Sequence, residues 1–146
     1  MKNLLFCITL TFALLASCSS KNSDEMSNAE LLTLGIWTRT LDFENKNGTF
    51  VEYGFDCYKD NRWEFKADGK VIYDDGPVDC DPDTPPVDPI ELGWVLEGND
   101  QQLIIQFPFD EAKYSIVELN GSKLVMDEIE PGTANTITNH RVILER

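Results

Sequence analysis

Cysteines are the residues of this 146-residue chain whose positions bear most directly on chemistry. A thiol can be acylated, oxidised to a disulfide or used as a metal ligand, and its surroundings decide which of these happens. Two cysteines lie near the start of the chain and two lie in its body: Cys7, Cys18, Cys57 and Cys80. The two pairs therefore call for separate explanations.

The first cysteines belong to a segment with the pattern of an export signal. Lys2 places one positive charge near the start, and an almost unbroken apolar run, Leu4–Leu15, follows it. Small residues then precede Cys18, which completes the three-part pattern of a secretory signal. The run is shorter than the roughly 20 apolar residues that a transmembrane helix needs. We therefore expect residues 1–17 to be removed on export.

The cleavage region, Leu15-Ala16-Ser17-Cys18, resembles the lipobox of bacterial lipoproteins. That resemblance implies a diacylglyceryl group on the Cys18 thiol and a fatty acyl chain such as palmitate on its amine, so that Cys18 binds the lipid bilayer. Several acyl chains on one residue anchor firmly, whereas one chain anchors only marginally. In lipoproteins an aspartate directly after the lipidated cysteine can retain the protein at the inner membrane. Ser19 occupies that position here, so the resemblance implies the outer membrane. The alternative is an ordinary signal with an incidental cysteine.

Composition limits the possible partners of the remaining chain. The whole sequence has a net charge of −14, and the loss of Lys2 with the signal makes it −15. An acidic surface repels nucleic acid and anionic lipid head groups, so we expect no nucleic-acid partner. Residues 18–29 are mostly polar and predict a flexible tether. Residues 30–146 are long enough for one domain with its own core.

The sequence offers little support for catalysis or metal binding. His140 is the single histidine, and no nucleophile elbow, phosphate loop or zinc-protease motif is present. The segment Asp79–Asp83 alternates carboxylates like the start of a calcium loop. However, Thr84 and Ile90 occupy the positions where an EF-hand needs glycine and glutamate. We predict a protein that is not an enzyme and has no cofactor or metal, with a looser calcium site in this loop as an open alternative.

One short helix and a series of short strands are expected in the domain. Ser27 and Glu30 have the spacing of a capping box at a helix start. From Ile36 onward, apolar and polar residues alternate with period two, and Asn-Gly and Asp-Gly pairs mark tight turns. The expected strands are 36–43, 49–55, 62–66, 71–73, 94–97, 103–107, 113–119, 123–129 and 137–144. This pattern predicts an all-β fold, an antiparallel up-and-down barrel of about eight strands, with a sandwich as the alternative.

Cys57 and Cys80 are expected to form a disulfide. If Asp68-Gly69 is a two-residue hairpin loop, Phe65 lies opposite Ile72 and the two cysteines are equally distant from the turn. Exported proteins meet an oxidising compartment in which disulfides persist. The alternative, a redox or metal-binding pair, lacks the Cys-x-x-Cys spacing that would support it.

The domain also resembles a known family. Gly35-Ile36-Trp37 is similar to the Gly-x-Trp signature of lipocalins. Residues 30–146 resemble the lipocalin-like domain of Gram-negative envelope lipoproteins, which have a cysteine before and a cysteine after a Phe-x-x-Asp-Gly hairpin. The resemblance implies that Trp37 closes the barrel and that Arg141, on the last strand, packs across it through a cation–π contact.

Aromatic residues on several strands indicate where a ligand could bind. An eight-stranded barrel has an interior that side chains fill or that holds one small ligand. We expect either a protein that binds a small apolar ligand in its barrel, or a non-catalytic interaction module with a filled barrel that presents loops such as 76–89 to a protein partner. The candidate cavity residues are Trp63, Phe65, Trp94, Phe107 and Tyr114.

Overall fold

The computed structural model describes residues 26–78, 80, 83, 88–130 and 137–146. The predicted signal and tether, with Cys18, lie outside the described residues except for the last part of the tether. Within the described part, no helix is long and apolar enough to cross a bilayer. The elements are α1 (Asn28–Leu32), β1 (Ile36–Lys46), β2 (Thr49–Glu52), the 3-10 helix η1 (Asp56–Tyr58), β3 (Arg62–Phe65), β4 (Lys70–Asp74), β5 (Ile90–Glu97), β6 (Gln102–Gln106), β7 (Glu111–Leu119), β8 (Lys123–Ile129) and β9 (Ile137–Glu145).

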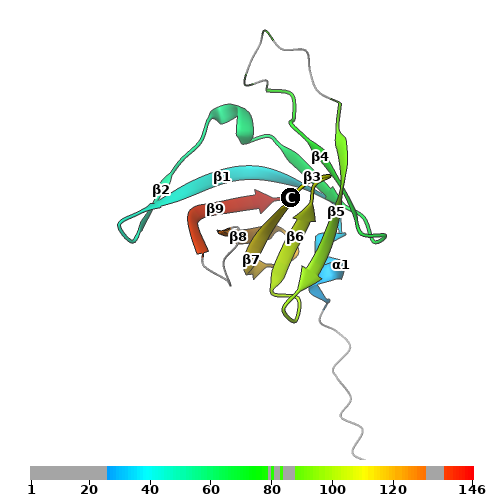
Figure 1. Cartoon of the computed structure of the whole chain (residues 1–146). Coiled ribbons are helices and arrows are strands. Elements are labelled where there is room, and N and C mark those ends of the chain that lie inside the picture. Colours follow the sequence, from blue (N-terminus) through cyan, green and yellow to red (C-terminus); the bar gives the residue numbers. More distant parts are fainter. Residues whose placement is uncertain (1–25, 79, 81–82, 84–87, 131–136) are drawn as a thin grey trace, which may run out of the picture.

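The strands form one antiparallel sheet that closes on itself. Their order is β2-β1-β3-β4-β5-β6-β7-β8-β9, and β1 also pairs with β9 (Figure 1). Eight of the described strands therefore form the barrel, and β2 is paired with the far part of β1. Closure removes the exposed strand edges that invite aggregation. The predicted all-β barrel is confirmed, and the sandwich alternative is excluded.

The long strand β1 makes three different pairings along its length. Its first residues pair with β3, and its last residues pair with β2. Most of its length also pairs with β9, from Thr38 opposite Glu145 to Glu44 opposite His140. This ladder shifts register between Arg39 and Leu41, which marks a β-bulge. The bulge changes which side chains of β1 face the barrel interior.

Alternation along the strands places one apolar set inside the barrel. The buried cluster comes from α1 and from every barrel strand except β7, whose inward residues are half-buried against it, because inward positions recur every second residue. Its members are Leu32, Trp37, Trp63, Phe65, Val71, Leu92, Leu103, Ile105, Leu124, Met126 and Leu144. Burial of this set is the main driving force for the fold.

The hairpin between β3 and β4 corrects the predicted two-residue loop. Phe65 lies opposite Val71, and the loop is Ala67–Gly69, with the Gly69 amide donating to the Lys66 carbonyl over 3.2 Å. Gly69 has a φ of +83°, as a three-residue hairpin loop requires. The predicted register would have turned Val71 outward, since a one-residue slip reverses the faces of a strand. Burial of both Phe65 and Val71 therefore selects the longer loop.

The helix α1 covers one end of the barrel, called here the helix end. Ser27 and Glu30 form the predicted capping box. The Trp37 indole Nε1 donates to the Leu32 carbonyl over 2.8 Å, and both side chains are fully buried. Asn28 Nδ2 donates to the Asp100 carbonyl over 2.7 Å, which attaches α1 to the β5–β6 turn at the same end (Figure 1).

Arg146, and not Arg141, is the arginine that packs on Trp37. The Arg146 guanidinium carbon lies 4.3 Å from the centroid of the Trp37 ring. The predicted contact of Arg141 with Trp37 is wrong, because Arg141 lies opposite Phe43 at the other end of the β1–β9 ladder. The first and last strands do pair, as the prediction required, but the register places Arg141 far from Trp37.

Arg141 instead stabilises the outer face of the barrel. Its Nε and Nη2 donate to the two carboxylate oxygens of Asp127 over 2.6 and 2.8 Å. Its guanidinium carbon lies 4.2 Å from the centroid of the Phe50 ring. Bidentate pairs of this geometry are among the stronger hydrogen bonds in proteins. The hydrogen bonds to Asp127 also raise the pKa of Arg141, so its guanidinium stays charged.

We predict that Arg141→Met lowers the free energy of unfolding more than Arg146→Met does. The first substitution leaves Asp127, which is 8 % exposed, without its partner and should cost about 2 kcal/mol. The second removes a cation–π contact at an exposed side chain and should cost about 0.5–1 kcal/mol. Urea denaturation of both variants measures the difference. A larger loss for Arg146→Met would contradict this account of closure.

Candidate functional site

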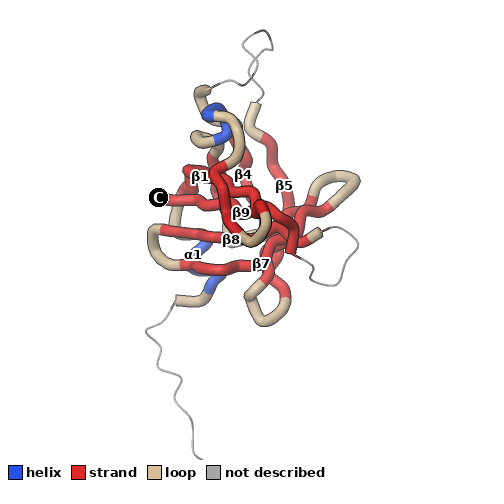
Figure 2. Tube along the Cα trace, turned by 90° about the vertical axis from the view of Figure 1, so that its left-hand side faces the viewer, coloured by secondary structure: helices blue, strands red, loops and turns tan. Residues whose placement is uncertain are grey.

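The other end of the barrel, called here the disulfide end, carries η1 and the Cys57–Cys80 disulfide. Figures 1 and 2 both place η1 and α1 at opposite ends of the barrel. The Cα atoms of the two cysteines are 5.2 Å apart, so the predicted disulfide is confirmed. It closes a loop with a sequence separation of 23 residues and stabilises the fold by about 3 kcal/mol in the chain-entropy model.

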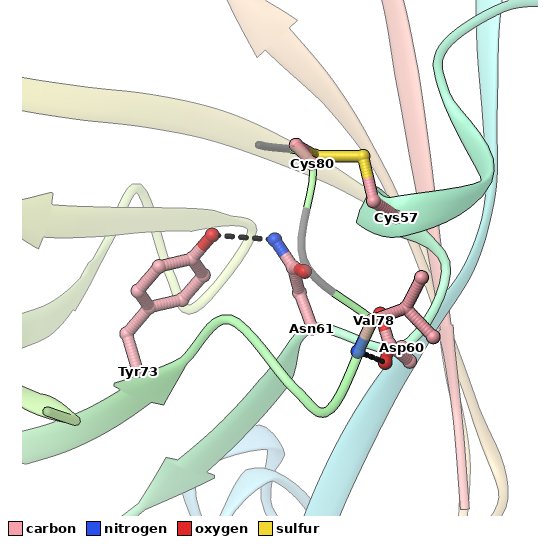
Figure 3. Close-up of a disulfide and its surroundings, with 6 residues drawn as sticks. All are labelled: Cys57, Asp60, Asn61, Tyr73, Val78 and Cys80. Atoms are coloured by element: carbon pink, nitrogen blue, oxygen red, sulfur yellow. Dashed lines mark hydrogen bonds between the residues drawn. A yellow bond between two sulfur atoms is a disulfide. The ribbon is translucent and has the colours of Figure 1, made fainter. Parts of the chain in front are cut away.

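A buried asparagine joins the segments around the disulfide (Figure 3). The Asn61 amide and the Tyr73 hydroxyl are 2.5 Å apart. With amide oxygen and nitrogen exchanged from the orientation drawn, the hydroxyl donates to the amide oxygen, and Nδ2 donates to the carbonyls of Cys57 and Asp75 over 3.1 and 2.8 Å. In that orientation Asn61 connects η1, β3 and the end of β4.

Asp60 and Gly76 bring the chain after β4 close to the chain before β3. Asp60 Oδ2 accepts a hydrogen bond of 2.8 Å from the Val78 amide (Figure 3). A Cβ atom at Gly76 would lie 2.5 Å from the Asp60 carbonyl oxygen, and the φ of Gly76 is +77°. Only glycine allows this approach. These contacts and the disulfide hold the described segments of the disulfide end in place.

An ion pair lies inside the barrel on β1. Arg39 Nη2 is 2.6 Å from Asp42 Oδ2, and Arg39 Nε donates to Asp42 Oδ1 over 2.9 Å. Arg39 is opposite Leu144 and Asp42 is opposite Val142, and both of these β9 residues belong to the interior. Residues three apart on a regular strand face opposite sides. The bulge between Arg39 and Leu41 is what turns both charges inward.

Three tyrosines lie near this ion pair: Tyr58, Tyr73 and Tyr114. The Arg39 guanidinium carbon lies 5.6 Å from the centroid of the Tyr58 ring. Burial, reinforced by the nearby Glu128 carboxylate, raises the pKa of Tyr114 to about 12. Burial, reinforced by Asp75, likewise raises the pKa of Tyr73 above its ordinary range. Both hydroxyls are therefore protonated at neutral pH and can donate hydrogen bonds.

Trp63 is a buried aromatic residue with an unused hydrogen-bond donor. Its ring contacts Tyr73 edge to face at 4.9 Å and is stacked with Phe65 at 6.3 Å between ring centroids. The side chain is 7 % exposed, and its Nε1 has no partner among the described residues. A buried donor left without an acceptor costs about 1–3 kcal/mol. By contrast, the indole nitrogen of Trp94 donates to the Lys66 carbonyl over 3.0 Å.

The structure places four of the five predicted cavity residues on the inner surface. Trp63 and Phe65 belong to the buried cluster, and Trp94 and Tyr114 are half-buried against it. Phe107 does not belong to it, because it follows the end of β6 and is 40 % exposed. Sequence reasoning missed Arg39 and Asp42, whose inward placement depends on a bulge that alternation does not reveal. It also passed over Tyr73 as a site residue, although the structure places it on the inner face of β4 with Val71.

The remaining candidates for chemistry do not come together. The ring centroids of His140 and Tyr53 are 5.3 Å apart, and Tyr53 lines a shallow surface hollow of about 420 Å³ after β2. Among the described residues, no group of three or more histidine, cysteine, aspartate or glutamate side chains could hold a metal ion. The possible calcium loop, Asp79–Asp83, lies largely outside the described residues.

These features define a small antiparallel barrel with a helix over one end and polar groups in its interior. The family model described as "Lipocalin-like domain" matches residues 33–126, which is more than half of the chain. The chain therefore belongs to the lipocalin-like domain family, as its sequence motifs predicted. No curated protein and no solved structure matches it in the corresponding searches.

We predict that removing one member of the Arg39–Asp42 pair destabilises the fold, whereas replacing both members with apolar residues does not. Asp42→Leu leaves the Arg39 charge in the barrel without its partner and should lower the free energy of unfolding by about 3 kcal/mol. The double variant Arg39→Met with Asp42→Leu should lie within about 1 kcal/mol of the wild type, because no unpaired charge remains. Thermal and urea unfolding measure both. A double variant as unstable as the single one would contradict the interior placement of the pair.

Proposed function

We propose that this protein is a lipid-anchored lipoprotein of the bacterial envelope whose barrel binds a small apolar ligand through the disulfide end. The proposal adds an anchor and a ligand class to the binding role that a lipocalin-like barrel suggests in general. It treats the protein as a binding protein and not an enzyme, since fold alone does not supply a reaction. The observation that supports the proposed ligand site is the uneven burial of side chains that face the barrel interior.

The inward side chains of the barrel differ in burial. Inward residues near the helix end, such as Trp37, Leu124 and Leu144, are fully buried. Among the inward residues toward the disulfide end, Leu92 and Ile105 are buried, whereas Tyr73 and Tyr114 are half-buried although they pack against the core. The half-buried tyrosines support the proposal that small molecules enter the interior from the disulfide end.

The attachment of the chain agrees with this direction of entry. The helix α1 begins at Asn28 and lies at the helix end, so the proposed tether joins the barrel opposite the disulfide end (Figure 1). An acylated Cys18 would thus hold the protein on a membrane without covering the proposed entrance. Ser19, in place of an aspartate, places that membrane as the outer membrane in this proposal.

A second function is favoured by exposed aromatic residues near the disulfide end. Phe109, in the turn between β6 and β7, is fully exposed, and Phe55, between β2 and η1, is 71 % exposed. Exposed apolar side chains of this size often mark interaction sites when they gather into a patch. The alternative proposal is a non-catalytic interaction module that presents these loops to a protein partner.

Binding of the uncharged fluorophore N-phenylnaphthylamine tests the first function against the second. We predict that the protein enhances its fluorescence and that Ala112→Phe, which fills the interior opposite Ile105, weakens binding at least about tenfold. Ser115→Phe is the matched control, because Ser115 lies on the same strand opposite Asp127 on the outer face. Absence of binding, or equal weakening by both variants, would reject a ligand site inside the barrel.

The anchor is tested separately. We predict that Cys18→Ala leaves an unprocessed precursor that takes up no radiolabelled palmitate, because the thiol is the acceptor of the first lipid. Wild-type protein should be labelled and should fractionate with the outer membrane. Cleavage of the variant at the same bond together with unchanged membrane attachment would overturn the lipoprotein proposal, and wild-type protein in the inner membrane would overturn the location.

A further inference from the structure

We propose that the ligand carries an uncharged oxygen acceptor, such as an ester, ketone or quinone carbonyl, which Trp63 Nε1 and the Arg39 guanidinium bind inside the barrel. This inference rests on the proposed ligand-binding function and names the chemical class of that ligand. It starts from the one indole nitrogen in the described interior that has no partner.

Trp63 and Arg39 are neighbours on adjacent strands. Trp63 lies opposite Trp37, and the Arg39 amide donates to the Asn61 carbonyl over 2.8 Å. Trp63 and Arg39 therefore occupy diagonal positions on the inner face, where long side chains reach the same space. Both also lie near Tyr73, whose ring contacts Trp63 and whose hydroxyl lies within the electrostatic reach of Arg39.

Trp63 and Arg39 both present hydrogen-bond donors to the barrel interior. An indole nitrogen can only donate a hydrogen bond, and a guanidinium has five N–H groups and no acceptor. Two of the Arg39 nitrogens contact Asp42, which leaves N–H groups of Arg39 for another acceptor. The protonated hydroxyl of Tyr114 adds a donor across the interior. A ligand that satisfies this site must therefore present an acceptor atom.

Charge decides which acceptor fits. Asp42 already neutralises Arg39, and Glu128 lies opposite Tyr114 on the inner face of β8. A ligand carboxylate would add a negative charge near the Asp42 and Glu128 carboxylates, which is unfavourable where solvent screening is weak. A cationic ligand would suit Glu128 but would leave the Trp63 donor unsatisfied. An uncharged carbonyl accepts from the donors and adds no charge.

The test uses three ligands that share a linear alkyl chain and differ in the charge of the head group: methyl decanoate, decanoate and decylamine. Each is titrated against protein loaded with N-phenylnaphthylamine at neutral pH. Methyl decanoate should displace the fluorophore at a concentration at least about tenfold lower than either charged ligand. Equal potency, or stronger displacement by decanoate or decylamine, overturns the inference.

Two substitutions test the named groups. Trp63→Phe keeps an aromatic ring but removes the donor, and it should weaken methyl decanoate binding about fivefold. Trp94→Phe also changes an inner-surface indole, but its nitrogen already donates to the Lys66 carbonyl, so the loss of methyl decanoate binding should be smaller than in Trp63→Phe. Asp42→Asn frees the Arg39 charge and should shift the preference toward decanoate. An unchanged preference in this variant and equal effects of the two tryptophan substitutions would also overturn the inference.

Failure of this inference can be told from failure of the proposed function. If N-phenylnaphthylamine binds in the Ala112-dependent manner but the three heads compete equally, the binding function stands and the carbonyl assignment is wrong. If neither the fluorophore nor any of the three ligands binds, both are rejected.

Discussion

The pairing of β1 with β9 is the constraint on which the rest of the structure depends, because it closes the sheet and sets what each end of the barrel contains. Its register places Trp37 at the helix end, within reach of Arg146. The bulge between Arg39 and Leu41 then turns Arg39 and Asp42 to the same side. Without it, strand alternation would place one member of this ion pair outside the barrel.

The two ends of the barrel are stabilised by different means, and this difference underlies the proposed function. At the helix end, α1, Trp37 and Leu32 form a fully buried apolar plug. At the disulfide end, the Cys57–Cys80 disulfide and the Asn61 hydrogen bonds fix the surrounding segments instead. The proposed entrance therefore lies at the end that the disulfide and these hydrogen bonds stabilise.

Much of the fold could be predicted from the sequence, because it depends on local signals. The capping box of Ser27 and Glu30, the period-two strands and the paired cysteines each identify a feature that the structure contains. Register could not be predicted in the same way. Phe65 was paired with the wrong residue because the turn signal Asp68-Gly69 does not distinguish a two-residue loop from a three-residue loop.

The candidate site was predictable only in its apolar part. Hydrophobic alternation identifies Trp63, Phe65, Trp94 and Tyr114 as inward residues, whereas Phe107 lies beyond the end of its strand, where alternation no longer determines burial. Arg39 and Arg141 are both arginines on terminal strands, and nothing in their local sequence separates the inward one from the outward one. Their positions follow from bulges and ladder register, which are long-range properties of the closed sheet.

The central claim is that the ligand enters the interior of the barrel from the disulfide end. The most direct test is a measurement of nuclear Overhauser effects between N-phenylnaphthylamine protons and assigned side chains of the protein. The account predicts contacts with Tyr73, Tyr114 and the Trp63 indole. Contacts confined to exposed residues such as Phe55 and Phe109, with none to the interior side chains, would contradict it.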